Sequence, residues 1–281
     1  MKRFAQLLFM LALCTMGSLH SQTSMRDNFS TAWSVNAFNK DVFVENKGQF
    51  DAYAETEKIL YVADAGRMQI CFTSHGVMYR YNEYPVRKKE EKEWESEKEG
   101  VIKPQVRFFS AEWKGTNSDL IIDASEEVSY YYTYGETPEK AIQAKAFKKV
   151  TYRNLYPGID VEYTFINDKP GLKYSLIVHP GADISGIKLH YSGAKRISLN
   201  ETGDLNIETS MGEFTEYAPV TFYTNGNKLN SSYKLQGKDI SFNVDNIDPQ
   251  QTVIIDPWVT NPNISGGWNA NAAYDVDFDD Y

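Results

Sequence analysis

Short runs of alternating apolar and polar residues, separated by glycine-containing turns, are the feature that most constrains this chain. Residues 58–81 predict three strands, with turns at the sequences DAGR and SHG. Residues 196–209 predict a strand pair around ETGD, and Asn225-Gly226 predicts a two-residue hairpin turn within residues 220–235. The 19 tyrosines and 15 phenylalanines favour strands over helices. The sequence therefore predicts an all-β protein built from antiparallel hairpins.

The same pattern is densest in residues 152–191, where proline-glycine turns separate the predicted strands. Pro157-Gly158 and Pro180-Gly181 each predict a turn in which glycine takes the position that needs a positive φ. Apolar residues alternate with polar ones on both sides of these turns, so one face of each strand is expected in the core. This regularity indicates a segment that builds a sheet rather than one that carries out chemistry.

The N-terminus has the pattern of a secretory signal peptide over residues 1–21. Lys2 and Arg3 precede an apolar run at residues 4–13, and small and polar residues follow, so cleavage after Ser21 is predicted. No other apolar run reaches the length of a transmembrane helix. We therefore expect an exported protein without a transmembrane segment, located outside the cell or on its outer surface.

The cysteines and the charge exclude several classes of protein. Cys14 offers lipidation as an alternative to simple cleavage, but Leu13 stands where a lipobox needs a small residue. Only Cys71 then remains, so an internal disulfide is excluded. The net charge of −9 disfavours nucleic acids and anionic membranes as partners, because both attract basic surfaces.

Composition divides the chain into a leader, a lead-in, a domain and a short final segment. Residues 22–40 are polar and predict a flexible lead-in, and residues 41–257 predict an antiparallel β-sandwich-like domain, as one sandwich or two sub-sandwiches. Within it, residues 87–100 mix acidic and basic side chains and predict a solvated loop. Residues 137–150 begin with Thr-Pro-Glu and predict a short helix. Residues 258–281 predict the truncated start of a further β-rich unit.

Five motifs in a fixed order connect this domain to a known architecture. They are VENKGQF (44–50), NLYPGIDVEY (154–163), LKYSLIVHPGADISGIKLHYSGA (172–194), GDLNIET (203–209) and VIIDPWV (253–259). Together they resemble the N-terminal domain of bacterial exported surface proteins that carry SBBP repeats, which form a seven-bladed β-propeller. The resemblance implies a β-rich module of uncharacterised function that precedes the propeller, in a family common in Bacteroidota.

The resemblance also gives a meaning to the final residues. The sequence AAYDVDFDDY, residues 272–281, is similar to the opening of a first propeller blade. Its apolar residues alternate with aspartates, and the sequence stops within this strand-turn unit. We therefore expect the chain to be a fragment of a longer protein that carries the propeller.

The tyrosines in SYYYTYG are the leading candidates for a binding site. Alternation places Tyr130, Tyr132 and Tyr134 on one face of a strand and Tyr131 on the other. Such a row can form a platform on which sugar rings stack, and these three residues are the predicted carbohydrate-binding residues. The alternative is packing in the core or at an interface, because one face of a sandwich strand is buried.

Two pairs of residues suggest catalysis, each with a structural alternative. Asp160 and Glu162 lie two apart on a predicted strand, so both can face one way and could hydrolyse a glycoside if their spacing and pKa values were suitable. The alternative is that Asp160 is there because aspartate is favoured directly after a turn. Cys71 and His75 would form a nucleophilic pair only in contact, whereas the MQICF sequence indicates a buried and inert cysteine. No catalytic residue is therefore predicted.

Two groups of residues raise the question of metal binding. His179 and His190 flank a predicted hairpin, and only Asp183 suggests itself as a further ligand. An acidic run near the C-terminus superficially resembles a calcium loop but lacks its glycine and its final glutamate. This run consists of Asp275, Asp277, Asp279 and Asp280. Neither a metal nor a cofactor is predicted.

Three functions follow from these patterns. The leading one is a non-catalytic module of an exported surface protein that supports its own propeller and acts in adhesion or matrix interaction, with an extracellular protein or glycan as partner. The second is a carbohydrate-binding module that uses the tyrosine row. The third is an extracellular glycoside hydrolase, which requires two carboxylates that converge in a cleft.

Overall fold

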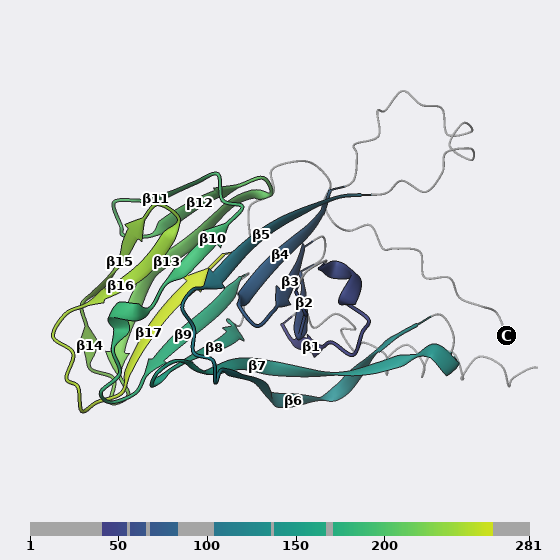
Figure 1. Ribbon diagram of the computed structural model, residues 1–281, viewed down its shortest axis with the longest axis horizontal. Helices are drawn as coiled ribbons and strands as arrows, with labels where there is room; N and C mark the ends of the chain where they lie inside the picture. The colour runs from purple at the N-terminus through teal and green to yellow at the C-terminus, as the bar shows by residue number, and fades with distance from the viewer. Residues whose placement is uncertain are drawn as a thin grey trace, which may run out of the picture. The chain divides into compact units, whose positions relative to one another are not determined.

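The computed structural model describes residues 41–54, 57–65, 68–83, 104–135, 138–166 and 171–260. Nearly all secondary structure in these ranges is antiparallel β-strand, which confirms the all-β fold class (Figure 1). The predicted signal peptide, lead-in and charged loop lie outside the described residues, as does the predicted repeat start beyond Thr260. Within the described residues, no helix is long and apolar enough to cross a membrane.

The strands form two facing sheets, in each of which neighbouring strands pair antiparallel. From one edge to the other, the first sheet consists of β15 (Ser231–Gln236), β16 (Asp239–Val244), β10 (Leu189–Ser192), β5 (Gln105–Trp113), β4 (Gly76–Glu83), β3 (Met68–Phe72), β2 (Tyr61–Ala65) and β1 (Phe43–Glu45). The second consists of β8 (Ile159–Phe165), β9 (Leu172–Val178), β17 (Val253–Val259), β13 (Gly212–Tyr223), β12 (Leu205–Thr209) and β11 (Arg196–Leu199), with β14 (Lys228–Leu229) beside β13. Short 3₁₀ turns are η1 (Asp51–Tyr53), η3 (Pro138–Lys140) and η4 (Ile184–Gly186).

A long hairpin of β6 (Ile121–Tyr134) and β7 (Ile142–Tyr156) connects the two sheets (Figure 1). The first half of β7 pairs with β1, and its second half pairs with β8. At the opposite edge, side chains of β15 donate hydrogen bonds to backbone carbonyls of β13. The two sheets are therefore layers of one nearly closed sandwich.

Aromatic side chains from both sheets meet in the core. The Phe214 ring of β13 lies 5.1 Å from Tyr79 of β4 and 4.9 Å from Phe109 of β5, measured between ring centroids. Trp113 of β5 meets Tyr174 of β9 edge to face at 5.7 Å. All five side chains are buried, and burial of one large apolar side chain contributes about 1.5–3 kcal/mol. These contacts hold the sheets together.

A second, smaller core lies under the VENKGQF motif. Asn46 organises this turn, because its Oδ1 accepts hydrogen bonds from the Gly48 and Phe50 amides at 2.9 and 3.1 Å, and its Nδ2 donates to the Ile59 carbonyl at 2.9 Å. The turn carries Phe50 onto a cluster that includes Cys71 of β3. The motif thus closes one end of the sandwich.

The sequence located most strands and turns correctly. The strands expected in residues 58–81 are β2 to β4, and the pair expected in residues 196–209 is β11 and β12. Gly158 adopts the predicted positive φ, 72°, and its carbonyl accepts a hydrogen bond from the His179 amide at 2.9 Å. The proline-glycine turn therefore ties the start of β8 to the end of β9.

The helix predicted over residues 137–150 is wrong. After the single turn of η3, residues 142–150 belong to β7. The alanines and lysines there have good helix propensity, but Ala144 and Ala146 lie buried at alternating positions, which is the period of a strand. Pairing with β6 on one side and β1 on the other outweighs the local preference.

Candidate functional site

The most unusual group in the interior is a fully buried carboxylate, Glu216 of β13. The Tyr174 hydroxyl of β9 donates to its Oε1 at 2.5 Å, and the Tyr191 hydroxyl of β10 donates to its Oε2. The buried Tyr233 of β15 lies beside the carboxyl group, and its hydroxyl donates to the Tyr217 carbonyl at 2.7 Å. We call these four residues the Glu216 centre. It joins two strands of the second sheet to two strands of the first.

The surroundings of Glu216 control its protonation. Burial raises the pKa of the Glu216 carboxyl above its usual range, although the hydrogen bonds from the tyrosines act in the lowering direction. Burial also raises the pKa of Tyr174 and Tyr191, which therefore remain donors. The two hydroxyls provide one donor to each carboxylate oxygen of Glu216.

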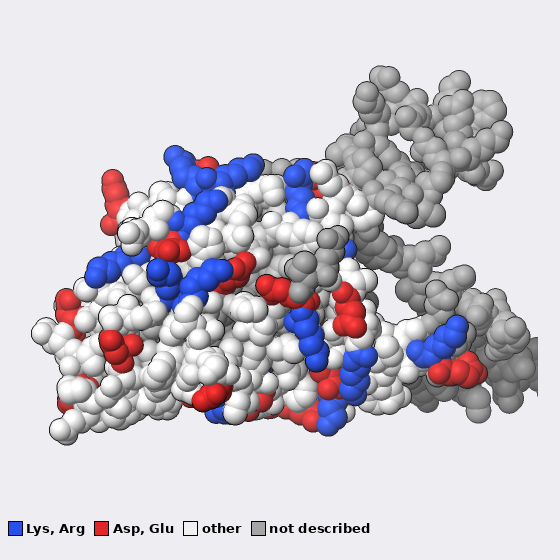
Figure 2. All heavy atoms as spheres, viewed as in Figure 1, with Lys and Arg blue, Asp and Glu red and all other residues white. Residues whose placement is uncertain are grey.

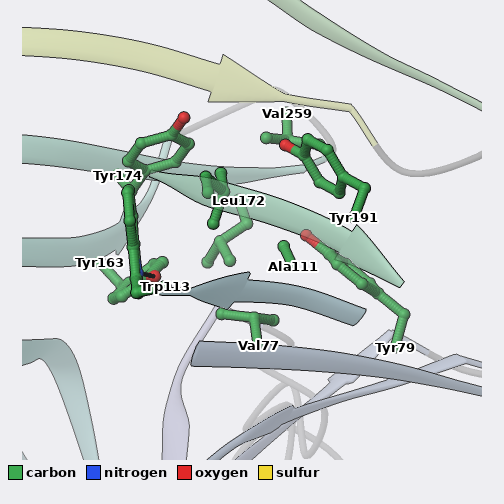
Figure 3. A pocket seen from close by; sticks show the side chains of 10 residues that line it. Val77, Tyr79, Ala111, Trp113, Tyr163, Leu172, Tyr174, Tyr191 and Val259 are labelled. Carbon is green, nitrogen blue, oxygen red and sulfur yellow. Dashed lines mark hydrogen bonds between the residues drawn. The ribbon is translucent and has the colours of Figure 1, made fainter. Parts of the chain in front are cut away.

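A small cavity adjoins the Glu216 centre. Trp113, Tyr163 and Tyr174 lie on one side of it, and Tyr79 and Tyr191 lie on the other (Figure 3). The Trp113 indole nitrogen donates to the Tyr163 hydroxyl at 2.8 Å. The centre of a water molecule can move through about 10 Å³ of this space, which suits one ordered water. Room for about one water molecule is too little for a sugar ring.

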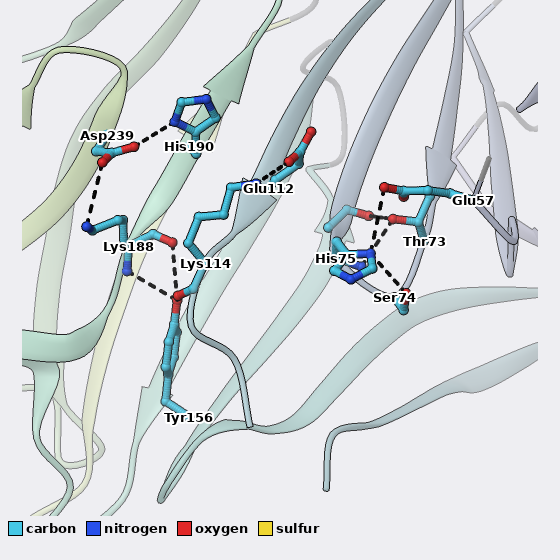
Figure 4. Close-up of polar contacts among 11 residues, drawn as sticks. Glu57, Thr73, Ser74, His75, Glu112, Lys114, Tyr156, Lys188, His190 and Asp239 are labelled. Atoms are coloured by element: carbon cyan, nitrogen blue, oxygen red, sulfur yellow. Dashed lines mark hydrogen bonds and ion pairs between the residues drawn. The ribbon is translucent and has the colours of Figure 1, made fainter. Parts of the chain in front are cut away.

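A second polar group lies on the outer face of the first sheet (Figure 4). His190 Nδ1 lies 2.6 Å from Asp239 Oδ1, and Lys188 Nζ lies 3.6 Å from Asp239 Oδ2. The hydrogen bond from His190 is the largest of the interactions that hold the pKa of Asp239 below its usual range. Below this pair, the Tyr156 hydroxyl donates to the Lys114 carbonyl at 2.9 Å and accepts from the Lys188 amide at 3.2 Å. The group fixes β10 against β16 and β5.

The described domain corresponds to a known but uncharacterised family. A profile described as a domain of unknown function (DUF7948) matches residues 43–258, from the first residue of β1 almost to the end of β17. The chain belongs to the DUF7948 family. No curated protein and no solved structure matches it. The match agrees with the resemblance to an uncharacterised β-rich domain, and it places the Glu216 centre inside the DUF7948 domain.

The tyrosine row of the DUF7948 domain lies along β6. The Tyr130 ring is 37% exposed and lies 5.9 Å from the half-buried Tyr132 ring. Tyr134 packs edge to face on Phe50 at 5.1 Å, and burial raises the pKa of its hydroxyl to about 12. Tyr131 points to the other face and is 59% exposed. The structure therefore brings the Tyr130 and Tyr132 rings together, and it packs Tyr132 and Tyr134 against the second core.

The two carboxylates considered for glycoside hydrolysis each have their own partners. Asp160 accepts from the Asn154 amide at 2.6 Å and pairs with His179 Nε2 at 3.1 Å. Glu162 pairs with Lys149 at 3.2 Å. Both side chains lie at half-buried positions of β8, in alternation with its buried residues. These contacts stabilise the outer face of the second sheet.

Cys71 and His75 lie in different environments. Cys71 is fully buried in the second core, and burial raises the pKa of its thiol to about 12, so the thiol stays protonated. His75 lies in the turn after β3, where Ser74 Oγ and Glu57 Oε1 approach the same ring nitrogen, Nδ1, at 3.1 and 3.7 Å (Figure 4). A catalytic triad needs the nucleophile and the acid on opposite nitrogens. This arrangement caps a turn.

The candidate metal ligands do not converge. His179 pairs with Asp160 and His190 pairs with Asp239, while Asp183 caps η4 by accepting from the Ser185 amide at 2.8 Å. Among the described residues, no three His, Cys, Asp or Glu side chains are placed to hold a metal ion. The acidic run between Asp275 and Asp280 lies outside the described residues.

Sequence reasoning missed the Glu216 centre. The sequence GEFTEYAPV places Glu216 on the same strand face as Phe214, which is a visible sign that a carboxylate points into the core. Its partners come from positions 42 and 25 residues earlier in the chain, and no local pattern connects them. The alternation alone was therefore the available signal.

Proposed function

We propose that the DUF7948 domain is a non-catalytic module of an exported protein, which supports a following β-propeller at the outer cell surface and acts in adhesion or matrix interaction. One observation carries this proposal: aromatic side chains from both sheets pack between them, and the Tyr174 and Tyr191 hydroxyls bind the buried Glu216. The cavity beside the Glu216 centre holds about one water molecule. We therefore assign contact with other molecules or domains to the outer faces of the sandwich.

The sequence supports the place of this module in a longer exported protein. Residues 1–21 have the pattern of a signal peptide. The ordered motifs of the domain and the AAYDVDFDDY sequence after it resemble proteins in which SBBP repeats follow such a domain. A sandwich whose two sheets are joined at both edges is well suited to hold a neighbouring domain at a fixed position, because its own layers cannot separate easily.

The export and support role is tested in the native bacterium with the natural protein. We expect the mature protein to begin at Gln22 by N-terminal mass spectrometry. We also expect an externally added protease to remove it from intact cells, while a cytoplasmic marker survives. Intact Met1 in a protein that is protected together with the marker would overturn the proposal.

A second candidate, a carbohydrate-binding module, rests on the exposed tyrosines of β6. The exposed Tyr130 ring lies beside the half-buried Tyr132 ring, and an exposed aromatic ring can stack on a sugar. The test is a polysaccharide binding screen with the natural chain and with two variants, Tyr130→Ala and Tyr131→Ala. Saturable binding that Tyr130→Ala abolishes and Tyr131→Ala preserves would support this function. Equal binding by all three proteins would exclude the tyrosine pair.

A further inference from the structure

The outer face of the second sheet carries apolar side chains on three neighbouring strands, around the Asp256 side chain. Strand pairing sets Ile177 beside Ile254, Ile254 beside Phe222, and Trp258 beside Tyr217. We define the apolar outer patch by the residues that β9, β17 and β13 present on this face: Ile177, Ile254, Trp258, Tyr217, Val220 and Phe222. Val220 is 50% exposed and Tyr217 is 40% exposed. Contiguous exposed apolar groups mark interaction surfaces more often than isolated ones do.

A β-bulge in β13 builds this patch. Tyr217 pairs with Trp258 and Val220 pairs with Asp256, so β13 takes three steps where β17 takes two. The extra residue brings Tyr217 and Val220 to the same outer face, although strict alternation would place them on opposite faces. Pro257 lies opposite the bulge, where the hydrogen-bond ladder is already interrupted.

Side chains hold the bulge in place. The Tyr217 carbonyl accepts from the Tyr233 hydroxyl at 2.7 Å, and the Pro219 carbonyl accepts from Ser231 Oγ at 2.9 Å. The Ala218 amide, which has lost its ladder partner, donates to Asp204 Oδ1 at 2.8 Å. The backbone groups freed by the bulge are thus satisfied without any partner molecule. The patch is therefore a preformed surface.

The two aromatic rings of the patch are also preformed. Tyr217 and Trp258 stack with their centroids 4.6 Å apart and their planes 8° from parallel. Polar side chains lie beside them on the same face: Lys173 pairs with Asp256 at 2.8 Å, and Ser175 donates to Asp256 at 2.6 Å. Aromatic and aliphatic groups beside a polar network are the composition of a protein–protein interface.

The structure favours the residues that follow β17 in this chain as the group that covers the apolar outer patch. β17 is the middle strand of the patch, and beyond it the Thr260 amide still donates to the Thr215 carbonyl at 2.9 Å. The following residues, 261–281, start at the edge of the patch and have an extended length of about 70 Å. The patch spans only about 13 Å from Ile254 to Trp258, at about 3.3 Å per strand residue. The segment has ample length to cover it.

The composition of this segment matches the patch. Tyr274, Val276 and Phe278 alternate with aspartates, so an extended conformation gives one apolar face and one acidic face. We propose that the apolar outer patch is a docking surface for residues 261–281, the start of the unit that comes after the DUF7948 domain. The proposal rests on the proposed function, because it identifies the surface through which the module supports the next unit of the chain.

Hydrogen–deuterium exchange on the whole chain tests the docking directly. We expect peptides within residues 261–281 to exchange more slowly than an unstructured peptide. In Val220→Asp this protection falls about tenfold, because a charge on the patch cancels the burial of an apolar contact. The matched control is Ser241→Asp, which adds the same charge on the half-buried outer side of β16 in the first sheet and leaves the protection unchanged.

Several outcomes overturn the proposal. One is an exchange rate in the natural chain equal to that of an unstructured peptide, and another is unchanged protection in Val220→Asp. If sedimentation shows a dimer that Val220→Asp dissociates, the patch seats a second copy instead. If Val220→Asp melts earlier than Ser241→Asp, the milder variant Tyr217→Ser replaces it and must lower the protection. Hydrogen–deuterium exchange does not depend on export or surface exposure. A negative exchange result therefore overturns the docking and not the proposed function, and a negative export result overturns the proposed function and not the docking.

Discussion

The DUF7948 domain holds two kinds of carboxylate, and their environments push their acidity in opposite directions. Glu216 lies in the core, where burial raises its pKa. Asp239 lies half-exposed on the outer face, where His190 lowers its pKa. A buried carboxylate loses the stabilisation that water gives its charge, whereas a surface carboxylate keeps water and gains a hydrogen bond. The comparison shows that the same functional group can either oppose or favour the folded state, according to its position.

Replacement of the buried carboxylate, Glu216, should change the free energy of unfolding most. Glu216→Ala leaves a void and deprives the Tyr174 and Tyr191 hydroxyls of their acceptor. We expect the free energy of unfolding to fall by about 3–5 kcal/mol. Urea unfolding measures this value, with Glu112→Ala, an exposed-face carboxylate, as control. A loss below about 1 kcal/mol would mean that the Glu216 centre does not hold the sheets together.

Removal of a single donor should have an intermediate effect. Tyr191→Phe keeps the ring of the residue and deletes the hydroxyl that donates to Glu216. The expected loss is about 1–3 kcal/mol, because a buried carboxylate oxygen remains without that donor. The pKa of Glu216 should rise further, since this hydrogen bond acts in the lowering direction. Tyr131→Phe, at an exposed position, is the control and should unfold like the natural protein.

The pH dependence of stability distinguishes the buried Glu216 from the surface Asp239. Because the pKa of Glu216 is raised above 4.5, its contribution to stability is fully present below pH 4.5 and is lost as the pH rises through the folded-state pKa. Glu216→Gln mimics the neutral acid and removes this loss. We expect the variant to become more stable relative to the natural protein as the pH rises from about 4 to about 8. A difference that is constant over this range would contradict the raised pKa.

The smallest effect is expected at the surface. Asp239→Asn removes the negative charge beside His190 and Lys188, and solvent screening limits the loss to about 0.2–1 kcal/mol at neutral pH. Since the pKa of Asp239 is lowered, its contribution is present above pH 3.8 and disappears as the pH falls through the lowered value. Thermal unfolding at about pH 3 and about pH 7 tests the sign. An equal loss at both values would show that the pair does not act through charge.

The sequence predicts a structural feature well when that feature depends on residues close together in the chain. β9 alternates strictly between buried and half-buried residues, so its face assignment followed directly from the sequence. β7 was mistaken for a helix because its pairing with β6 and β1 lies outside any local window. The burial of Tyr134 likewise depends on Phe50, which is far away in the sequence. The alternation of apolar and polar residues therefore predicted strands correctly. Contacts between residues far apart in the sequence decided the cases that it did not predict.

The site was less predictable than the fold, for the same reason. Glu216 stood out only as a charged residue at an inward position beside Phe214. The hydroxyls of Tyr174 and Tyr191 that donate to it come from β9 and β10, which only the folded sandwich brings to β13. The bulge at Pro219 shifts the alternation by one residue, so the outward direction of Val220 could not be read from spacing.

The positions of the first and last strands have a mechanical consequence. β17 lies between β9 and β13, and β1 lies between β2 and β7, so both of these strands have neighbours on both sides. The hydrogen bonds of antiparallel ladders run perpendicular to the strands. Tension along β17, transmitted from residues beyond Thr260, therefore shears two ladders at once and cannot open them one bond at a time. The pairing of β17 on both sides therefore resists a pull along the strand.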